Sequence, residues 1–292
     1  MPPTHTHLPQ RPRMLPAIAL IAALAVLTTS GCAVWRIRQS AELARQSEPF
    51  EASPAGAAAS LLVVGDSTAV GTGASSPANS VAGLIGQAHP RLKITNRAKD
   101  GAKFADIAGQ LNALGDQRFD AILVLGGGND VIRLTRYETL EQDIARTAEL
   151  ARTHAGLVVM MPSGNVGNAP FFFAPWSWWM TKRSQVLHGF VREAAKDNGA
   201  LYVNLYKDKE QDPFAQRPDE LNAKDGLHPS DAGYRLWLNE LNQQADFSNG
   251  WRLCAAKAEF RYRAASWRHP ALSWSRRACL PCETFRRRRE AL

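Results

Sequence analysis

Between residues 60 and 244, short apolar runs alternate with segments that have a helical pattern. The runs predict five strands, at Leu61–Val64, Leu92–Thr95, Phe119–Leu125, Leu157–Met161 and Leu201–Leu205. The other segments predict helices at about 79–89, 105–114, 138–154, 178–198 and 230–243. Strands that alternate with helices in this way form a parallel sheet with helices on both faces. The pattern therefore predicts one α/β domain of about 185 residues, a length that suits a single core.

The first apolar run ends in the sequence Gly65-Asp66-Ser67. Four branched apolar residues precede it, which is typical of a strand buried on both faces. The side chains that follow such a strand emerge at the carboxyl edge of the sheet, where open α/β sheets bind their ligands. Gly, Asp and Ser are also ordinary turn residues. This tripeptide alone therefore leaves both a functional site and a simple turn open.

Three further polar loops are predicted at the same edge, at residues 96–101, 126–130 and 225–230. Each has a simpler interpretation, because Gly-rich turns and Asp-Gly pairs commonly end strands. Together with Ser67, however, they supply a nucleophile, hydrogen-bond donors, a histidine base and a carboxylate. Four such loops at one predicted edge favour a catalytic site.

In their order along the chain, these loops resemble the sequence blocks of the GDSL, or SGNH, hydrolase family over roughly residues 60 to 244. The matches are the first block at Gly65-Asp66-Ser67, the second at Gly101, five residues after Asn96, the third at Gly127-Gly128-Asn129-Asp130 and the fifth at Asp225-x-x-His228-Pro229. The fourth block has no identifiable counterpart, and the stretch after Met161 is idiosyncratic, which leaves the substrate open. The resemblance implies a flavodoxin-like three-layer α/β/α sandwich with a five-stranded parallel sheet.

Acyl transfer by a serine needs an adjacent base, because the hydroxyl is a poor nucleophile until its proton is removed. Of the seven histidines, only His228 has an aspartate three residues earlier on a predicted edge loop. The resemblance makes Ser67 the nucleophile, His228 the base and Asp225 the carboxylate that holds the imidazole tautomer and stabilises the imidazolium. Three histidines at or within predicted helices are not expected to be catalytic: His89, His154 and His188.

The tetrahedral intermediate of acyl transfer carries an oxyanion that needs preorganised donors. The resemblance implies that these are the backbone N–H groups of Ser67 and Gly101 and the side-chain amide of Asn129. No Gly-x-Ser-x-Gly surrounds Ser67, so the nucleophile motif of the α/β-hydrolases does not apply. The sequence shows no metal-ligand cluster and no nucleotide-binding loop, and we expect the reaction to need neither a metal nor a cofactor.

We therefore expect a serine esterase that cleaves small-molecule, lipid or glycan esters through an acyl-serine. An acyltransferase or O-acetyl esterase acting on cell-envelope glycans would use the same residues, and a catalytically silent envelope-binding domain is the alternative from another class.

The stretch Pro170–Met180 holds six aromatic rings in nine residues and two prolines within six. Exposed aromatic surface of this kind marks binding sites or membrane contacts. It predicts an apolar lip at the site, with Phe172 and Trp176 as substrate-binding residues.

The N-terminus has the features of a membrane-targeting segment. Arg11 and Arg13 precede 21 uncharged residues, 14–34, which are long enough to span a bilayer core of about 30 Å. The segment also has the layout of a signal peptide. Thr29–Cys32 resembles a bacterial lipoprotein box, in which Cys32 would be lipidated. Residues 1–34 are thus expected to be either a signal of this kind or an uncleaved anchor, followed by a linker at 35–59. The catalytic part is expected outside the cytoplasm of a bacterium, tethered on the periplasmic side or the cell surface.

The net charge of +8 is concentrated at the C-terminus. Residues 60–244 hold 19 Lys and Arg against 20 Asp and Glu, whereas the last 48 residues hold 11 against 4. A nucleic-acid enzyme is therefore not expected. Residues 247–292 lack periodicity, and Cys279 and Cys282 are too few for a zinc site. We expect a monomer with a catalytic domain at 60–246 and a tail at 247–292 outside the fold.

Overall fold

The structure, a computed structural model, describes residues 14–245, without the side chains of residues 14–17, 21–30 and 32. The tail predicted at 247–292 lies outside these described residues. Five parallel strands form one sheet in the order β2-β1-β3-β4-β5. The strands are β1 Ala59–Gly65, β2 Leu92–Asn96, β3 Phe119–Gly126, β4 Ala155–Pro162 and β5 Leu201–Tyr202.

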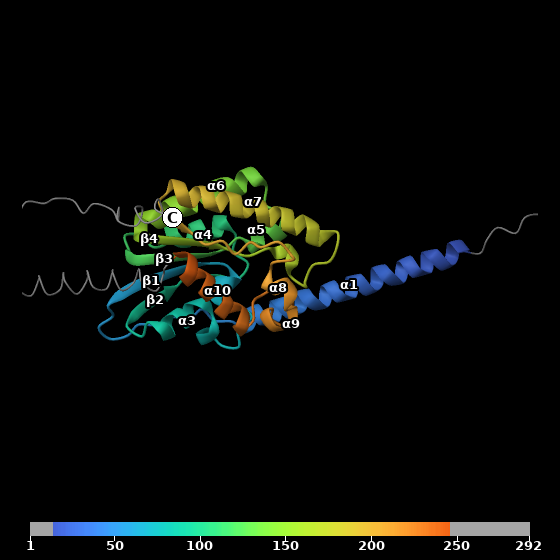
Figure 1. Ribbon diagram of the computed structural model, residues 1–292, viewed down its shortest axis with the longest axis horizontal. Coiled ribbons are helices and arrows are strands. Elements are labelled where there is room, and N and C mark those ends of the chain that lie inside the picture. The colour runs from blue at the N-terminus through green and yellow to red at the C-terminus, as the bar shows by residue number, and fades with distance from the viewer. Residues whose placement is uncertain (1–13, 246–292) are drawn as a thin grey trace, which may run out of the picture.

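Helices cover both faces of this sheet (Figure 1). The five predicted helices are α3 Val81–Ala88, α4 Phe104–Asn112, α6 Tyr137–His154, α7 Trp176–Asp197 and α10 Asp231–Ala245. The expected three-layer α/β/α fold is therefore confirmed. Six further short elements carry too few residues to show a helical period: α2 Ser67–Val70, α5 Gly128–Ile132, α8 Pro213–Gln216, α9 Pro218–Leu221 and the 3₁₀ turns Pro77–Asn79 and Val166–Asn168.

Strand β1 shows why its sequence is apolar without alternation. Leu62 and Val64 point into a core cluster that includes side chains of α4, α6 and α7. Leu61 and Val63 point into the opposite cluster, with side chains of α3 and α10. All four side chains are fully buried, and each contributes about 1.5–3 kcal/mol of apolar burial. The sheet is thereby fixed between two helical layers, with its carboxyl edge free to carry the loops.

Residues 35–59 differ from the linker that was expected. Residues 35–46 continue a 33-residue helix, α1 (Met14–Gln46), which leaves the domain at one side (Figure 1). Phe50 then packs against a core cluster, and Ala52 forms an antiparallel bridge with Ile94 of β2. Small and turn-forming residues resemble a linker in composition, but backbone pairing and one aromatic ring fasten this segment to the sheet. Among the residues whose side chains the structure describes, no helix combines the length and apolarity that a bilayer crossing requires.

Candidate active site

Strand β1 ends in a tight turn that places Ser67 at the sheet edge. A Cβ on Gly65 would lie 1.8 Å from the carbonyl oxygen of Leu125 on β3, so only glycine fits there. Asp66 then caps α2, because its Oδ1 accepts from the backbone N–H of Thr68 at 2.8 Å and from the Thr68 hydroxyl at 2.7 Å. Ser67 is the first residue of α2, where the helix itself offers the backbone N–H no acceptor. The turn therefore presents both the hydroxyl and the N–H of Ser67.

The loop before α10 holds Asp225 and His228. The backbone of Ala223 donates to the carbonyl of His228 at 2.7 Å, which closes the loop. Within it, Oδ1 of Asp225 accepts from the backbone N–H groups of Leu227 at 3.0 Å and His228 at 3.1 Å. The carboxylate is thus held by its own loop, and its other oxygen faces the imidazole.

Ser67, His228 and Asp225 form a continuous hydrogen-bonded chain. His228 Nε2 lies 2.9 Å from Ser67 Oγ, and His228 Nδ1 lies 2.6 Å from Asp225 Oδ2. A neutral imidazole with its proton on Nδ1 donates to Asp225 and accepts from the Ser67 hydroxyl. Burial opposes ionisation of Asp225, but the hydrogen bond and charge of His228, with other donors, lower its pKa to about 2. The structure brings together the three residues that the sequence predicts as a triad.

Gly101 follows β2 on a loop that is hydrogen-bonded to the segment that begins with Ser67. The Asn96 side-chain amide donates to the carbonyl of Ala69 in α2 at 2.9 Å, and the Thr72 hydroxyl donates to Asp100 at 2.6 Å. Gly101 has a positive φ of 76°, which favours glycine. In the described part of the chain, the backbone N–H of Gly101 donates no hydrogen bond. This N–H remains available for a ligand.

Asn129 lies in α5, directly after β3. Gly127 begins this turn with a φ of 99°, and a Cβ there would lie 2.9 Å from side-chain carbons of Leu187 and Phe104. The close packing of this glycine holds α5 at the sheet edge. Asn129 lines the same pocket as Ser67 and Gly101. The three residues expected to bind an oxyanion are therefore neighbours of one cavity.

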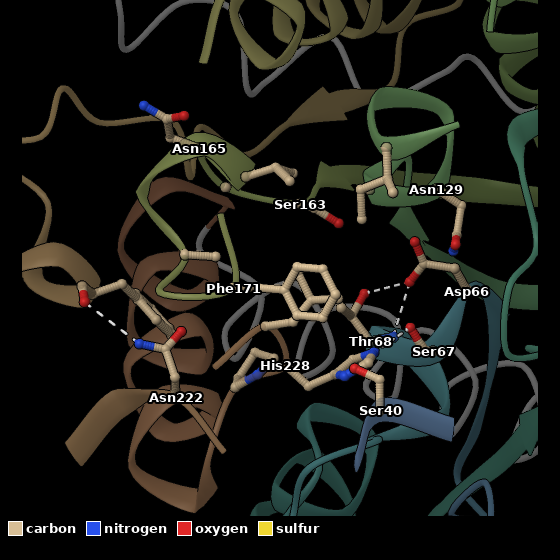
Figure 2. Close-up of a pocket in the computed structure, with 18 of the residues that line it drawn as sticks. Ser40, Asp66, Ser67, Thr68, Asn129, Ser163, Asn165, Phe171, Asn222 and His228 are labelled. Atoms are coloured by element: carbon tan, nitrogen blue, oxygen red, sulfur yellow. Dashed lines mark hydrogen bonds between the residues drawn. The ribbon is translucent and has the colours of Figure 1, made fainter. Parts of the chain in front are cut away.

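That cavity has a volume of about 380 Å³, within the usual range for a small-molecule site. Figure 2 shows Asn165 and Asn222 at one end, Ser67 and Asn129 at the other, and Phe171 between them. Several apolar side chains also line it: Ile37, Ile132, Val166, Leu205, Phe214 and Trp237. The arrangement suits an acyl compound with an apolar portion and a reactive carbonyl near Ser67.

The aromatic stretch contributes to this pocket through Phe171, which the sequence analysis did not single out. The Phe171 N–H donates to the carbonyl of Gly226 at 2.9 Å and so fastens the stretch to the histidine loop. Phe172 instead packs against the core cluster that contains side chains of α6 and α7. Trp176 is 50% exposed and stacks on Trp179 with ring centroids 5.6 Å apart. Contrary to the prediction, neither Phe172 nor Trp176 lines the pocket.

His188 and His154 bond with groups other than Ser67. His188 Nδ1 bonds with the Tyr202 hydroxyl at 2.7 Å, and Nε2 bonds with the Ser163 carbonyl at 2.8 Å. Burial lowers the pKa of His188 to about 4, which keeps this ring neutral. His154 Nδ1 bonds with the carbonyl of Gln117 at 2.8 Å. Both rings are structural.

Two other sequence predictions concern a metal site and the lipidation of Cys32. In the described part of the chain, no group of three or more His, Cys, Asp or Glu residues could hold a metal ion. The side chain of Cys32, the expected lipidation site, lies outside what the structure describes.

Solved structures share this fold at low sequence identity. TesA is 18% identical with a TM-score of 0.52, over 65% of this chain and 99% of TesA. LAE5, an α/β hydrolase enzyme from the metagenome of Lake Arreo, Spain, is 20% identical with a TM-score of 0.51, over 65% and 95%. A member of the lipolytic G-D-S-L family from Veillonella parvula is 15% identical with a TM-score of 0.50, over 63% and 96%.

A comparison with curated protein sequences finds no match. The profile of the GDSL-like lipase/acylhydrolase family, in contrast, matches residues 63–236. This range contains Ser67, Gly101, Asn129 and the loop with Asp225 and His228. The chain belongs to the GDSL-like lipase/acylhydrolase family of hydrolases.

Proposed function

We propose that the protein is a serine hydrolase that cleaves carboxylic esters through an acyl-serine intermediate. The observation that carries this proposal is the chain of hydrogen bonds from Ser67 through His228 to Asp225 beside a cavity of substrate size. The chemistry requires a nucleophile, a neutral base and an ionised carboxylate in this order.

In the acylation step, Ser67 Oγ attacks the ester carbonyl carbon while His228 Nε2 takes the hydroxyl proton. The carbonyl oxygen becomes an oxyanion, which the N–H groups of Ser67 and Gly101 and the amide of Asn129 stabilise. When the intermediate collapses, the imidazolium returns its proton to the leaving alcohol and the acyl group stays on Ser67. Water then attacks the acyl carbon while His228 takes a proton from it. The bond between the acyl carbon and Ser67 Oγ breaks, the imidazolium returns the proton to Oγ, and the carboxylic acid leaves. Asp225 stays ionised and stabilises the imidazolium in both steps.

The direct test compares the unaltered protein with Ser67→Ala on p-nitrophenyl esters of graded chain length. We expect turnover to be abolished, because the substitution removes the hydroxyl that bonds with His228 Nε2. A serine-reactive fluorophosphonate should label the unaltered protein and fail to label Ser67→Ala. The variant Ser47→Ala is the control, since Ser47 donates to the carbonyl of Leu43 within α1 and does not line the pocket. Labelling that persists in Ser67→Ala would assign the nucleophile to a different residue.

We further propose that the domain works outside the cytoplasm, tethered to a membrane whose lipid esters it can reach. Residues 14–34 are uncharged and belong to the same helix that contacts the pocket. Four exposed rings lie in the first turn of α7 or just before it: Phe173, Trp176, Trp178 and Trp179. Figure 1 shows α1 leaving the domain on the side of this end of α7. Aromatic rings of this kind favour the membrane interface.

The tether is tested by separating membranes from soluble proteins after expression in a bacterium. We expect the full chain in the membrane fraction. Incorporation of a labelled fatty acid that disappears in Cys32→Ser would identify a lipoprotein, whereas membrane association without such a label would identify an anchor helix. Recovery of the protein in the soluble cytoplasmic fraction would contradict both forms of the proposal.

A further inference from the structure

The last turns of α1 contact the pocket, although they precede the matched family region. Ile37, Ser40, Ala41 and Ala44 all line it. Their spacing of three, four and seven residues places them on one face of the helix. All four follow Cys32, so they would remain after processing at that residue.

Ser40 makes a specific contact with the proposed triad. Its hydroxyl donates to Asp225 Oδ2 at 2.5 Å, the same oxygen that faces His228 Nδ1 at 2.6 Å. Figure 2 shows Ser40 on the side of the pocket that holds Ser67. With the two backbone donors on Oδ1, the carboxylate receives four hydrogen bonds, which is its full capacity. The contact joins residues 185 positions apart in the sequence.

A second contact fixes the same part of α1 from another side. The Arg36 guanidinium donates to the carbonyl of Pro170, at the start of the aromatic stretch. Phe171 follows Pro170 and lines the pocket. The helix is thus held against the histidine loop through Ser40 and against the aromatic stretch through Arg36.

We propose that the α1 face of Ile37, Ser40, Ala41 and Ala44 is part of the active site. Ser40 is a positioning residue that fixes the Asp225 carboxylate toward His228, and the apolar members of the face form a wall along the acyl group. This inference rests on the proposed esterase function. It adds a substrate-contacting element supplied by the segment that leads to the membrane.

The positioning role is tested in the full chain with Ser40→Ala and Ser40→Thr. Because a hydrogen bond to a charged group is lost, we expect Ser40→Ala to lower kcat about tenfold or more. KM should change little, and Ser40→Thr should restore most of kcat because it keeps the donor. Ser47→Ala, at the residue directly after the end of α1, is the matched control. A wild-type kcat in Ser40→Ala, or a loss that Ser40→Thr does not rescue, would overturn the role.

The wall is tested by enlarging a small residue. Ala41→Leu should depress kcat/KM for octanoate esters at least tenfold while acetate esters stay within about twofold, since a short acyl group need not reach the added bulk. Val34→Leu is the control, because Val34 is exposed on α1 and does not line the pocket. An equal fractional loss for all chain lengths would overturn the wall. Activity that survives in Ser67→Ala would instead remove the proposed function itself.

Discussion

Two buried aspartates lie close to Ser67, and their pKa values shift in opposite directions. Asp66 precedes Ser67 in the turn after β1, whereas Asp225 reaches Ser67 through His228. Each residue is only 1% exposed. Burial raises the pKa of Asp66 to about 6, whereas Asp225 keeps a pKa of about 2 despite its burial. Burial alone therefore does not determine whether these carboxylates are ionised.

The hydrogen-bond donors around each carboxylate explain the difference. Thr68 supplies both side-chain and backbone donors to Oδ1 of Asp66. Asp225 receives two backbone N–H groups, the Ser40 hydroxyl and the imidazole of His228, which can itself become positive. Hydrogen bonds to the charged form and a nearby positive charge both favour ionisation. Asp66 is therefore a helix cap, and Asp225 is the hydrogen-bonded charge partner of His228.

The largest expected effect separates these two roles in activity. Asp225→Asn removes the charge that orients and stabilises the imidazole, and such a change costs about 10⁴ in kcat in serine hydrolases of this type. Asp66→Asn keeps an oxygen acceptor for Thr68, so we expect a loss below about tenfold. The measurement is kcat on p-nitrophenyl acetate for both variants near neutral pH. Equal losses in the two variants would mean that Asp66 also serves the base.

Much of the local structure around these two aspartates could be predicted from the sequence. The apolar run Leu61–Val64 lies within β1, and the polar residues after it predict a site at the sheet edge. The histidine loop is equally local, because Asp225 and His228 lie on one turn three residues apart. The strand at Leu201–Leu205 was predicted too long, since only Leu201 and Tyr202 pair with β4 at the sheet margin. Local patterns thus predict elements and turns well, and strand ends at a sheet margin less well.

The residues that sequence reasoning missed depend on contacts between distant segments. Ser40 lies on a helix, and nothing near it in sequence indicates that it will meet Asp225. Phe171 faces the pocket and Phe172 faces the core because one backbone bond to Gly226 sets the rotation of the stretch. Composition identifies such an aromatic stretch but contains no information on which ring turns inward.

The second expected effect is on stability and its dependence on pH. Below pH 3.8, Asp66 is protonated in both the folded and the unfolded chain, so folding buries no charge at this position. As the pH rises to about 6, the unfolded chain ionises first, and stability falls. A pKa raised from 3.8 to about 6 corresponds to about 3 kcal/mol in the free energy of unfolding. Asp66→Asn removes this loss, so we expect it to be more stable at pH 8 by about 1 to 3 kcal/mol.

Melting temperatures of the two proteins from pH 4 to pH 8 measure this effect. The difference should grow between pH 4 and 6 and then stay constant, reaching about 2 to 4 °C for each kcal/mol. Asp225 acts with the opposite sign, because its lowered pKa adds stability above pH 3.8 that is lost as the pH falls toward 2. A constant advantage of Asp66→Asn across the whole range would mean that the folded chain does not raise the pKa of Asp66.

The smallest expected effect concerns the hydroxyl of Thr68, which is the one side-chain donor to Asp66 that a substitution can remove without changing shape. Thr68→Val leaves the backbone donor in place and removes the 2.7 Å hydrogen bond to Oδ1. A bond to an ionised acceptor contributes about 1.5–3 kcal/mol and one to a neutral acceptor about 1 kcal/mol. Thr68→Val should therefore destabilise the protein by about 1 kcal/mol more at pH 8 than at pH 4.

The same substitution in the Asp66→Asn background should lose this pH dependence, because no charge remains at position 66. Chemical unfolding of the four proteins at both pH values gives the coupling free energy between the two side chains. A coupling of zero at pH 8 would show that Thr68 does not hold the ionised carboxylate, and the donor count around Asp66 would then no longer explain why its pKa differs so far from that of Asp225.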